Sequence, residues 1–256
     1  MKIIDTHCHL NDKALFSDLE NVINRARNAG VDKMIVVGWD KESSELAIKI
    51  AEQYDFIYAI IGFHPENIFD INDEILYETL ELYKHPKVVA IGEIGLDYHW
   101  TKEPEKRVLQ KAYFIKQVDF ANKVGLPISI HSREAFEDTL SILKEHKPEH
   151  GGVMHCYSGS VENLKDIINL NLFIGLDGPV TFTNAKTPKE VAAEIPLERL
   201  VVETDCPYLS PHPLRGTVNE PANISLIVDA IAEARDMSKK HLLDVLYQNS
   251  CELFNL

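Results

Sequence analysis

The sequence predicts a TIM-type (β/α)8 barrel that forms a single domain over residues 1–256. Short apolar runs alternate with longer amphipathic, charged stretches from one end of the chain to the other. Near-continuous apolar strands joined by helices are typical of a parallel sheet covered on its outer side. Eight strand–helix units fit a closed barrel, which typically takes about 250 residues, and no Gly/Ser-rich or Pro-rich linker suggests a second domain.

Eight apolar runs are the predicted strands. They cover residues 2–10, 33–39, 56–65, 88–97, 126–132, 151–158, 172–180 and 199–209. Between them, apolar residues recur at helical spacing, as in a stretch beginning at Leu19 and a long one running from Leu109 toward Gly125. Ser17 and Asp40 stand where N-cap residues are expected, and residues 223–254 are predicted to be closing helices of the same domain.

Composition limits the possible functions. The hydrophobic share of 45% is ordinary for a globular enzyme, and the formal net charge of −14 argues against a broad basic surface for duplex nucleic acid. The cysteines form no C-x-x-C pair and are expected to be reduced thiols. With no signal peptide and no membrane-spanning run in the sequence, we expect a cytoplasmic protein with no membrane partner, and a monomer.

Polar residues fall at the C-terminal ends of most of the predicted strands. They are His7, His9, His64, Glu93, His131, His155 and Asp205. In a β/α barrel this end carries the active site, because the strand ends and the βα loops converge there.

Alternation along the first strand predicts the direction of its two histidines. One face would carry Ile4, Thr6, Cys8 and Leu10, and the other Asp5, His7 and His9. Since the apolar set suits the helix side, we expect both imidazoles to point into the barrel mouth, with Cys8 packing outward.

A single histidine at a strand end is usually a hydrogen-bonded core or surface residue. Four histidines with two carboxylates at equivalent positions are costly to bury unless a cation pairs with them. Nitrogen and oxygen donors suit borderline to hard divalent ions, and six exceed the needs of one zinc with an open position. The interpretation is therefore two divalent ions, Mg, Mn or Zn. His7, His9, Asp205 and Glu93 would hold one, and His131 and His155 would hold the other with the same Glu93.

With these residues in place, the sequence resembles the TatD family of metal-dependent deoxyribonucleases, a branch of the amidohydrolase-like barrels. The matching stretches run in family order: "DTHCHL", "GFHP", "IGEIGLDY", "LPISIHSREA", "MHCYSGS" and "VETDCPYLSPHPLRG..NEP". The resemblance implies a β/α barrel, divalent metals at the six residues and phosphodiester hydrolysis. Many relatives carry a basic residue between "RG" and "NEP", whereas Thr217 and Val218 stand here, so we expect a weaker phosphate clamp at this loop.

Catalytic roles follow for three residues. Asp205 either takes the proton of a metal-activated water as general base or serves only as a ligand. Glu93 would bridge the two metals, and His64 would contact a phosphate or the leaving oxygen, with packing beside Pro65 as its ordinary alternative.

Other residues are candidates for substrate contact or support. Arg133 and Arg215 would bind phosphate, although a surface ion pair is the ordinary role for Arg133. Glu203 and Asp5 lie behind metal ligands and would orient them. The aromatic run Tyr98, His99 and Trp100 follows the fourth strand and can stack on a base.

Three functions remain in competition. The first is hydrolysis of DNA phosphodiesters, from an end and on single strands. The second is hydrolysis of an amide or ester bond, such as aminoacyl-tRNA deacylation; many such barrels bridge their metals with a modified lysine on strand four, and residues 88–97 contain none. The third is a binding module with structural metals, which six ligands spread over five strands disfavour.

Overall fold

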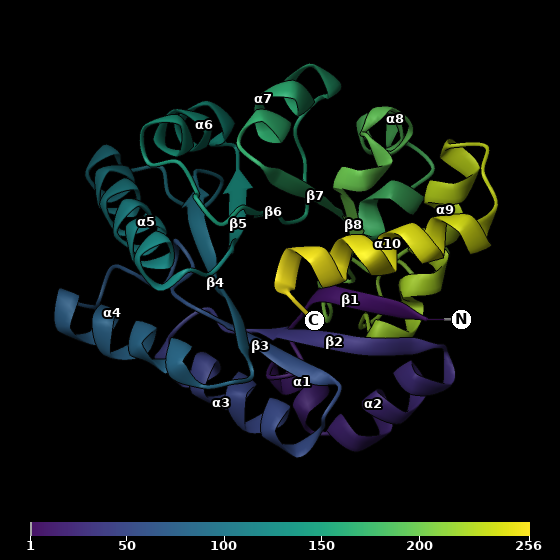
Figure 1. The fold of residues 1–256 in the computed structure, drawn as a ribbon, viewed down its shortest axis with the longest axis horizontal. Helices are drawn as coiled ribbons and strands as arrows, with labels where there is room; N and C mark the ends of the chain where they lie inside the picture. Colours follow the sequence, from purple (N-terminus) through teal and green to yellow (C-terminus); the bar gives the residue numbers. More distant parts are fainter. Residues whose placement is uncertain (1) are drawn as a thin grey trace.

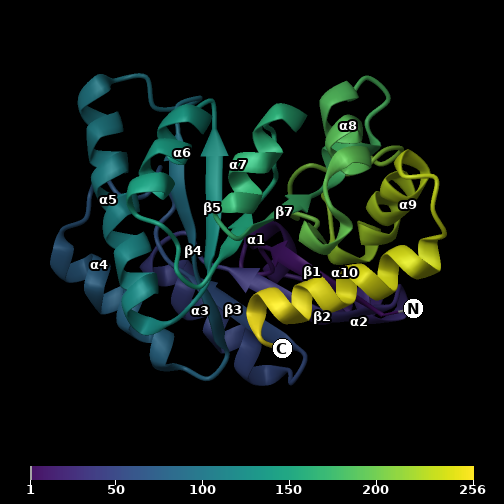
Figure 2. The ribbon, with the colours of Figure 1, turned by 45° about the horizontal axis from the view of Figure 1, so that its top comes forward.

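The computed structural model describes residues 2–256, and its eight parallel strands form one nearly closed barrel in chain order. Figures 1 and 2 show the strands grouped at the centre of the molecule. The strands are β1 (Ile3–Cys8), β2 (Val31–Val37), β3 (Ile57–Ile61), β4 (Val88–Asp97), β5 (Ile128–Arg133), β6 (Gly152–Met154), β7 (Leu172–Leu176) and β8 (Leu200–Val202). The predicted fold class is confirmed.

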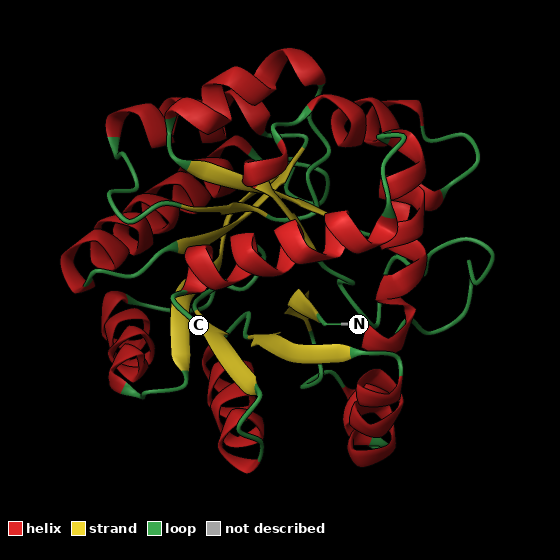
Figure 3. Ribbon diagram, turned by 45° about the vertical axis from the view of Figure 1, so that its right-hand side comes forward, coloured by secondary structure: helices red, strands yellow, loops and turns green. Residues whose placement is uncertain are grey.

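Helices follow the strands and surround the barrel (Figure 3). They are α1 (Lys13–Phe16), α2 (Leu19–Asn28), α3 (Lys41–Gln53), α4 (Asp73–Leu80), α5 (Pro104–Val124), α6 (Phe136–Glu145), α7 (Leu164–Asn169), α8 (Lys186–Glu194), α9 (Ile224–Ala234) and α10 (Lys239–Phe254). Asp40 caps α3 as predicted, whereas the expectation for Ser17 is wrong, because Ser17 ends α1 and Asp18 precedes α2. Within residues 2–256, no helix is both long and apolar enough to cross a bilayer.

Two apolar clusters hold the barrel together. The larger one fills the space between the strands and the surrounding helices. The smaller one lies inside the barrel, where Ile4, Ile35 and Val201 from the strands meet Leu253 and Phe254 from α10. The end of α10 therefore packs against apolar strand residues of this cluster, whereas the active site of such a barrel lies at the C-terminal ends of the strands.

The first and last strands meet at the C-terminal mouth of the barrel. The backbone N–H of Asp205 donates to the carbonyl of His7 at 3.0 Å, and the N–H of His9 donates to the carbonyl of Cys206 at 2.8 Å. These two hydrogen bonds link the segments that follow the first and last strands. They also place His7 and His9 beside Asp205, which lies about two hundred residues further along the chain.

The simple alternation predicted for the first strand is wrong. Ile4 lies in the cluster inside the barrel, whereas Ile3 and Cys8 lie in the outer cluster. The pairing of β1 with β2 shifts register between Asp5 and Cys8, so residues on either side of this irregularity do not follow one two-residue repeat. The His7 ring still points into the mouth, as predicted, because the irregularity changes the direction of its side chain.

Candidate metal centre

Glu93 occupies the middle of the mouth because β4 is irregular at that point. Ile91 pairs with Ile128 on β5 and Ile94 with Ile130, so three steps on β4 match two steps on β5. The extra residue in β4 forms a bulge, a device that re-aims a side chain beside a functional site. Glu93 is only 4% exposed, and its carboxylate lies between imidazoles from β1 and from the adjacent strand β5.

Gly95 permits the close approach of β4 to β5 that follows this bulge. Its φ is +142°, and a Cβ atom at this position would lie 1.9 Å from the carbonyl oxygen of His131. Only glycine fits such a contact. The absence of a side chain at Gly95 thus sets the position of His131 relative to Glu93.

Glu93 Oε2 belongs to one group of four donor atoms, together with His7 Nε2, His9 Nε2 and Asp205 Oδ1. The Nε2 atoms of His7 and His9 lie 3.2 Å apart, and they are 3.5 and 3.9 Å from Glu93 Oε2. The same two nitrogens lie 3.8 and 3.4 Å from Asp205 Oδ1. Tetrahedral zinc with nitrogen and oxygen ligands has ligand–ligand edges of about 3.3 Å, so these four donors can hold a divalent ion with small adjustments.

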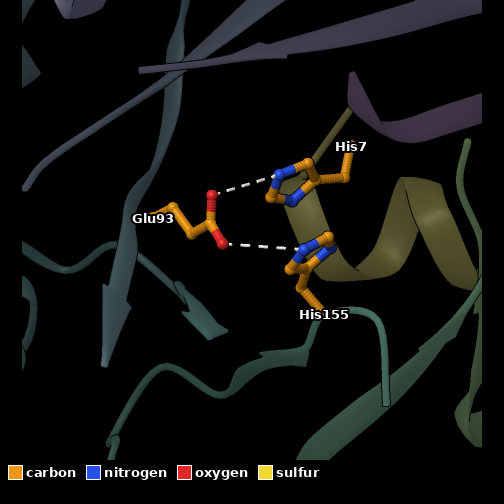
Figure 4. A group of neighbouring side chains, drawn as sticks. All are labelled: His7, Glu93 and His155. Carbon is orange, nitrogen blue, oxygen red and sulfur yellow. Dashed lines mark ion pairs between the residues drawn. The ribbon is translucent and has the colours of Figure 1, made fainter. Parts of the chain in front are cut away.

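A second group surrounds the other oxygen of the same carboxylate. Glu93 Oε1 lies 2.9 Å from His131 Nδ1, 3.6 Å from His155 Nε2 and 3.9 Å from His64 Nε2. Figure 4 shows the consequence for two of the rings, with His7 directed at one carboxylate oxygen and His155 at the other. Each oxygen of the carboxylate therefore faces its own imidazoles, and the two groups touch where the His7 and His155 rings stack with centroids 3.5 Å apart.

The pKa shifts of the buried side chains around Glu93 indicate that its carboxylates favour positive charge nearby. Burial raises the pKa of Glu93, but the hydrogen bond from His131 and the nearby imidazoles bring it well below its ordinary range. Burial lowers the pKa of His155, yet the carboxylates of Glu203 and Asp205 outweigh burial and raise it to about 10. Similar contacts with Asp97 and Glu93 raise the pKa of His131 to about 9. Protons on these rings occupy donor atoms that a divalent ion would use.

The donor chemistry fits a metal in two further respects. The Nδ1 atom of His7 is buried with no hydrogen-bond partner, and its Nε2 lies 3.2 Å from His9 Nε2. The Val37 carbonyl lies 3.1 Å from His9 Nδ1, so the neutral His9 ring carries its proton on Nδ1 and keeps a lone pair on Nε2 for a metal. The His, Glu and Asp groups at the mouth thus fit divalent metal binding.

Two carboxylates behind the mouth, those of Glu203 and Asp5, hold neighbouring residues of the site in place. Glu203 Oε1 lies 3.0 Å from His155 Nδ1, so Nε2 of that ring is left facing the centre, as the predicted supporting role requires. Gly175 on β7 leaves the space for this carboxylate, which a Cβ atom would approach to 2.5 Å. Asp5 has a different contact from the one predicted: it binds the backbone and hydroxyl of Thr204, and it touches His7 only through the backbone N–H.

Asp97 is a site residue that the sequence analysis missed. Its Oδ2 lies 3.0 Å from His131 Nε2, and its Oδ1 accepts hydrogen bonds from the backbone N–H groups of His99 and Trp100. Asp97 thus fixes the His131 ring from the side opposite Glu93. The available signal was its place at the end of a buried strand, four residues after Glu93.

The centre opens into a pocket of about 820 Å³. His64 and Arg133, two predicted substrate contacts, line it together with Asp97 and Trp100. The guanidinium of Arg215 packs 4.0 Å from the ring centroid of Phe182, outside the residues that line this pocket in the described chain. Its predicted phosphate contact stays a prediction.

Aromatic side chains form part of the pocket rim. Trp100 is 65% exposed and lies beside Arg133, whose Cζ is 5.8 Å from the ring centroid. The predicted stacking role is wrong for Tyr98, because its ring is buried and its hydroxyl donates to Asp138 at 2.7 Å. Trp39 and Tyr208 also line the pocket and pack near His9; the sequence analysis missed both.

A β/α barrel whose open mouth gathers imidazoles and carboxylates beside a substrate-sized pocket defines a metal-dependent hydrolase. Comparison with known proteins agrees. The family model described as TatD related DNase matches residues 4–255. The chain is 46% identical over 255 residues to the uncharacterized metal-dependent hydrolase YabD of Bacillus subtilis, covering 99% of each protein.

Solved structures give the same answer. The chain is similar to that of YjjV, a TatD homolog from Escherichia coli, with a TM-score of 0.92, 32% identity, and coverage of 99% of this chain and 98% of the other. A TatD-family hydrolase from Entamoeba histolytica follows with a TM-score of 0.87, 26% identity, and coverage of 98% and 97%. The chain belongs to the TatD family and is a metal-dependent hydrolase of that family.

Proposed function

We propose that this protein hydrolyses phosphodiester bonds in DNA, releasing nucleotides from an end of a single strand, with two divalent ions bridged by Glu93. The observation that carries the proposal is the Glu93 carboxylate, which presents one oxygen to His7 and His9 and the other to His131 and His155. A carboxylate placed between two groups of imidazoles would be shared by a pair of divalent ions, and such pairs stabilise both the attacking and the leaving oxygen of a phosphodiester. The description of the matching family as TatD related DNase supports DNA as the substrate.

The protein residues divide the work. Divalent ions bound at the centre would lower the pKa of the attacking water and stabilise the charge that develops on the phosphate. His7, His9 and Asp205 would hold one ion and His131 and His155 the other, with Glu93 shared. Asp205, with its Oδ1 facing three imidazoles, has its pKa held down by His155 and His9 against the effect of burial, so it is ionised and able to accept a proton from the water.

His64 suits contact with the substrate. Its Nδ1 accepts a hydrogen bond from the backbone N–H of Glu66 at 3.2 Å, which leaves Nε2 directed toward Glu93 and the pocket. Burial and the nearby His131 lower the pKa of His64 to about 3 in the metal-free protein. A neutral ring with a protonated Nε2 can donate a hydrogen bond to a phosphate or leaving oxygen without carrying charge.

The rim of the pocket favours a single strand. Arg133 offers a guanidinium for a phosphate, and the exposed Trp100 beside it offers a face for a base. A formal net charge of −14 disfavours long backbone contacts with a duplex. One or two nucleotides at a strand end match a pocket of about 820 Å³ better than a helix of two strands does.

A second candidate is hydrolysis of an ester such as aminoacyl-tRNA. A neighbouring pocket of about 600 Å³ shares Ser132, His155 and Ser158 with the first, and its wall carries carboxylates, including Glu134 and Glu137. An acidic wall next to the centre suits the ammonium group of an aminoacyl ester and repels phosphate.

A metal-dependence series on end-labelled oligonucleotides tests the proposal. Protein from which metals have been removed with a chelator is incubated with Mg²⁺, Mn²⁺ or Zn²⁺ and with single-stranded or duplex DNA. The His131→Ala variant serves as the inactive control. We expect a ladder that shortens from one end, faster on single strands. Faster hydrolysis of an aminoacyl ester than of any oligonucleotide, or equal DNA cleavage by His131→Ala, would reject it.

A further inference from the structure

Cys156 lies at the edge of the candidate metal centre in an unusual backbone conformation. Its φ is +44°, a left-handed value that few residues other than glycine adopt, and its backbone N–H donates to Glu203 Oε1 at 2.6 Å. Strained conformations of this kind collect at functional sites. The conformation leaves Cys156 among the residues that line the main pocket.

The surroundings of this thiol are those of a metal position. Donor atoms of His155, Cys156 and Asp205 all lie within 4.8 Å of one another. A fourth residue, Asp177 at the end of β7, is only 3% exposed and interacts with the Cys156 thiol. Its Oδ2 atom is buried without a hydrogen-bond partner. A buried carboxylate oxygen with no partner beside a thiol needs either a proton or a cation.

We propose that Cys156 and Asp177, together with His155 and Asp205, form a position for a thiophilic divalent ion such as Zn²⁺ at the edge of the centre. Sulfur, nitrogen and two carboxylates are a zinc donor set, and a thiolate selects zinc over Mg²⁺. On binding, the metal–sulfur bond forms and the thiol proton leaves to water. The ideal ligand–ligand edges are about 3.3–3.6 Å, so the loop after β6 has to close by about 1 Å.

This position shares two ligands with the candidate hydrolytic ions. Zinc bound at Cys156 takes His155 and Asp205 from their contacts with the group around Glu93. Zinc at this position would therefore compete with hard ions for these two ligands at the centre. The inference depends on metal binding at the mouth and not on which bond is hydrolysed.

Spectroscopy of the Co²⁺-loaded protein tests it without substrate. The chelated full-length chain is titrated with Co²⁺, and thiolate ligation gives a sulfur-to-cobalt charge-transfer band in the near ultraviolet. The band is expected in the wild type and in Cys251→Ser, the matched control on α10, and it is lost in Cys156→Ser. Asp177→Asn is expected to weaken Co²⁺ binding at this position about tenfold. A wild type without the band, or a band that persists in Cys156→Ser, overturns the proposal.

Alkylation of the wild type gives a second readout that needs no variant to fold. Cys8 and Cys206 are fully buried, so iodoacetamide has access only to Cys156 and Cys251. Stoichiometric Zn²⁺ is expected to slow the labelling of Cys156 at least about tenfold and to leave Cys251 unchanged, as mapped by mass spectrometry. Equal rates at Cys156 with and without zinc contradict the proposal. Because neither readout involves hydrolysis, its failure is distinct from failure of the proposed function.

Discussion

Replacing Asp97 by Asn tests how the protein orients His131. Asp97 Oδ1 accepts two backbone N–H groups at 2.8 and 3.0 Å, so the oxygen of an Asn side chain is retained there. The amide NH₂ then faces His131 Nε2, 3.0 Å away in the wild type, and it forces that nitrogen to act as an acceptor. The ring proton moves to Nδ1, which is the atom that points at Glu93.

The expected magnitude follows from this change of tautomer. With a proton on Nδ1, His131 has no lone pair to offer to a metal beside Glu93. Loss of a carboxylate that orients a metal-binding histidine costs 10–100-fold in affinity, which is about 1.4–2.7 kcal/mol. The Asn side chain can instead turn so that its oxygen faces His131. This orientation breaks two backbone hydrogen bonds at about 1 kcal/mol each, so the free-energy cost of the substitution is similar.

Isothermal titration of chelated protein with Mn²⁺ measures the effect. We expect one of two binding steps to weaken 10–100-fold in Asp97→Asn, with the other step changed less. Asp32→Asn is the matched control, since Asp32 also accepts a hydrogen bond, from Tyr247, but lies at the N-terminal end of β2, away from the mouth. Equal affinities and stoichiometries for Asp97→Asn and the wild type would refute the assigned role of Asp97.

Three further predictions follow from the same geometry. Glu93→Gln is expected to lower Mn²⁺ stoichiometry and to reduce hydrolysis at least about 100-fold, since the amide removes the negative charge and presents an NH₂ donor on one face; unchanged stoichiometry by metal analysis would oppose this. Trp100→Ala is expected to raise KM for single-stranded oligonucleotides with little change in kcat, corresponding to about 1–3 kcal/mol of stacking, and an unaltered KM would remove the stacking role. In the metal-free protein, burial raises the pKa of Asp5 to about 7. The contribution of the protonated carboxyl to the free energy of unfolding is therefore complete below the unfolded-state pKa near 4 and is lost as pH rises through 7. Urea unfolding at pH 5 and pH 8 should therefore show Asp5→Asn gaining about 2 kcal/mol relative to the wild type at the higher pH, and a difference independent of pH would contradict the burial argument.

Much of the fold and of the site was predictable from the sequence because it depends on position along each strand. Alternating apolar runs and helices define the barrel, and the polar residues that follow each run reach the same mouth. The six predicted metal ligands were expected to meet at one mouth. The structure brings donor atoms of His7 together with those of Glu93 and His155, and also with those of His9 and Asp205.

The remainder depends on contacts that no local pattern records. The bulges near His7 and Glu93 arise from pairing between neighbouring strands, and the contact between Asp97 and His131 depends on the close approach at Gly95. The alternation of inward and outward residues along one strand carries no information about such shifts in pairing.

The contacts of loop residues could not be predicted for a related reason. Cys156 and Asp177 follow different strands, and they meet only because β6 and β7 are neighbours in the barrel. Arg215 looked like a phosphate contact in its motif, yet its guanidinium packs on Phe182 in a loop whose path the sequence does not specify.

The central claim is that the Glu93 carboxylate bridges two divalent ions. Anomalous diffraction from crystals grown with Mn²⁺ measures this directly. The expected result is two peaks per chain, one within bonding distance of Glu93 Oε2 beside His7 and His9 and one within bonding distance of Oε1 beside His131 and His155. A single peak, or peaks that lie away from Glu93, would contradict the account.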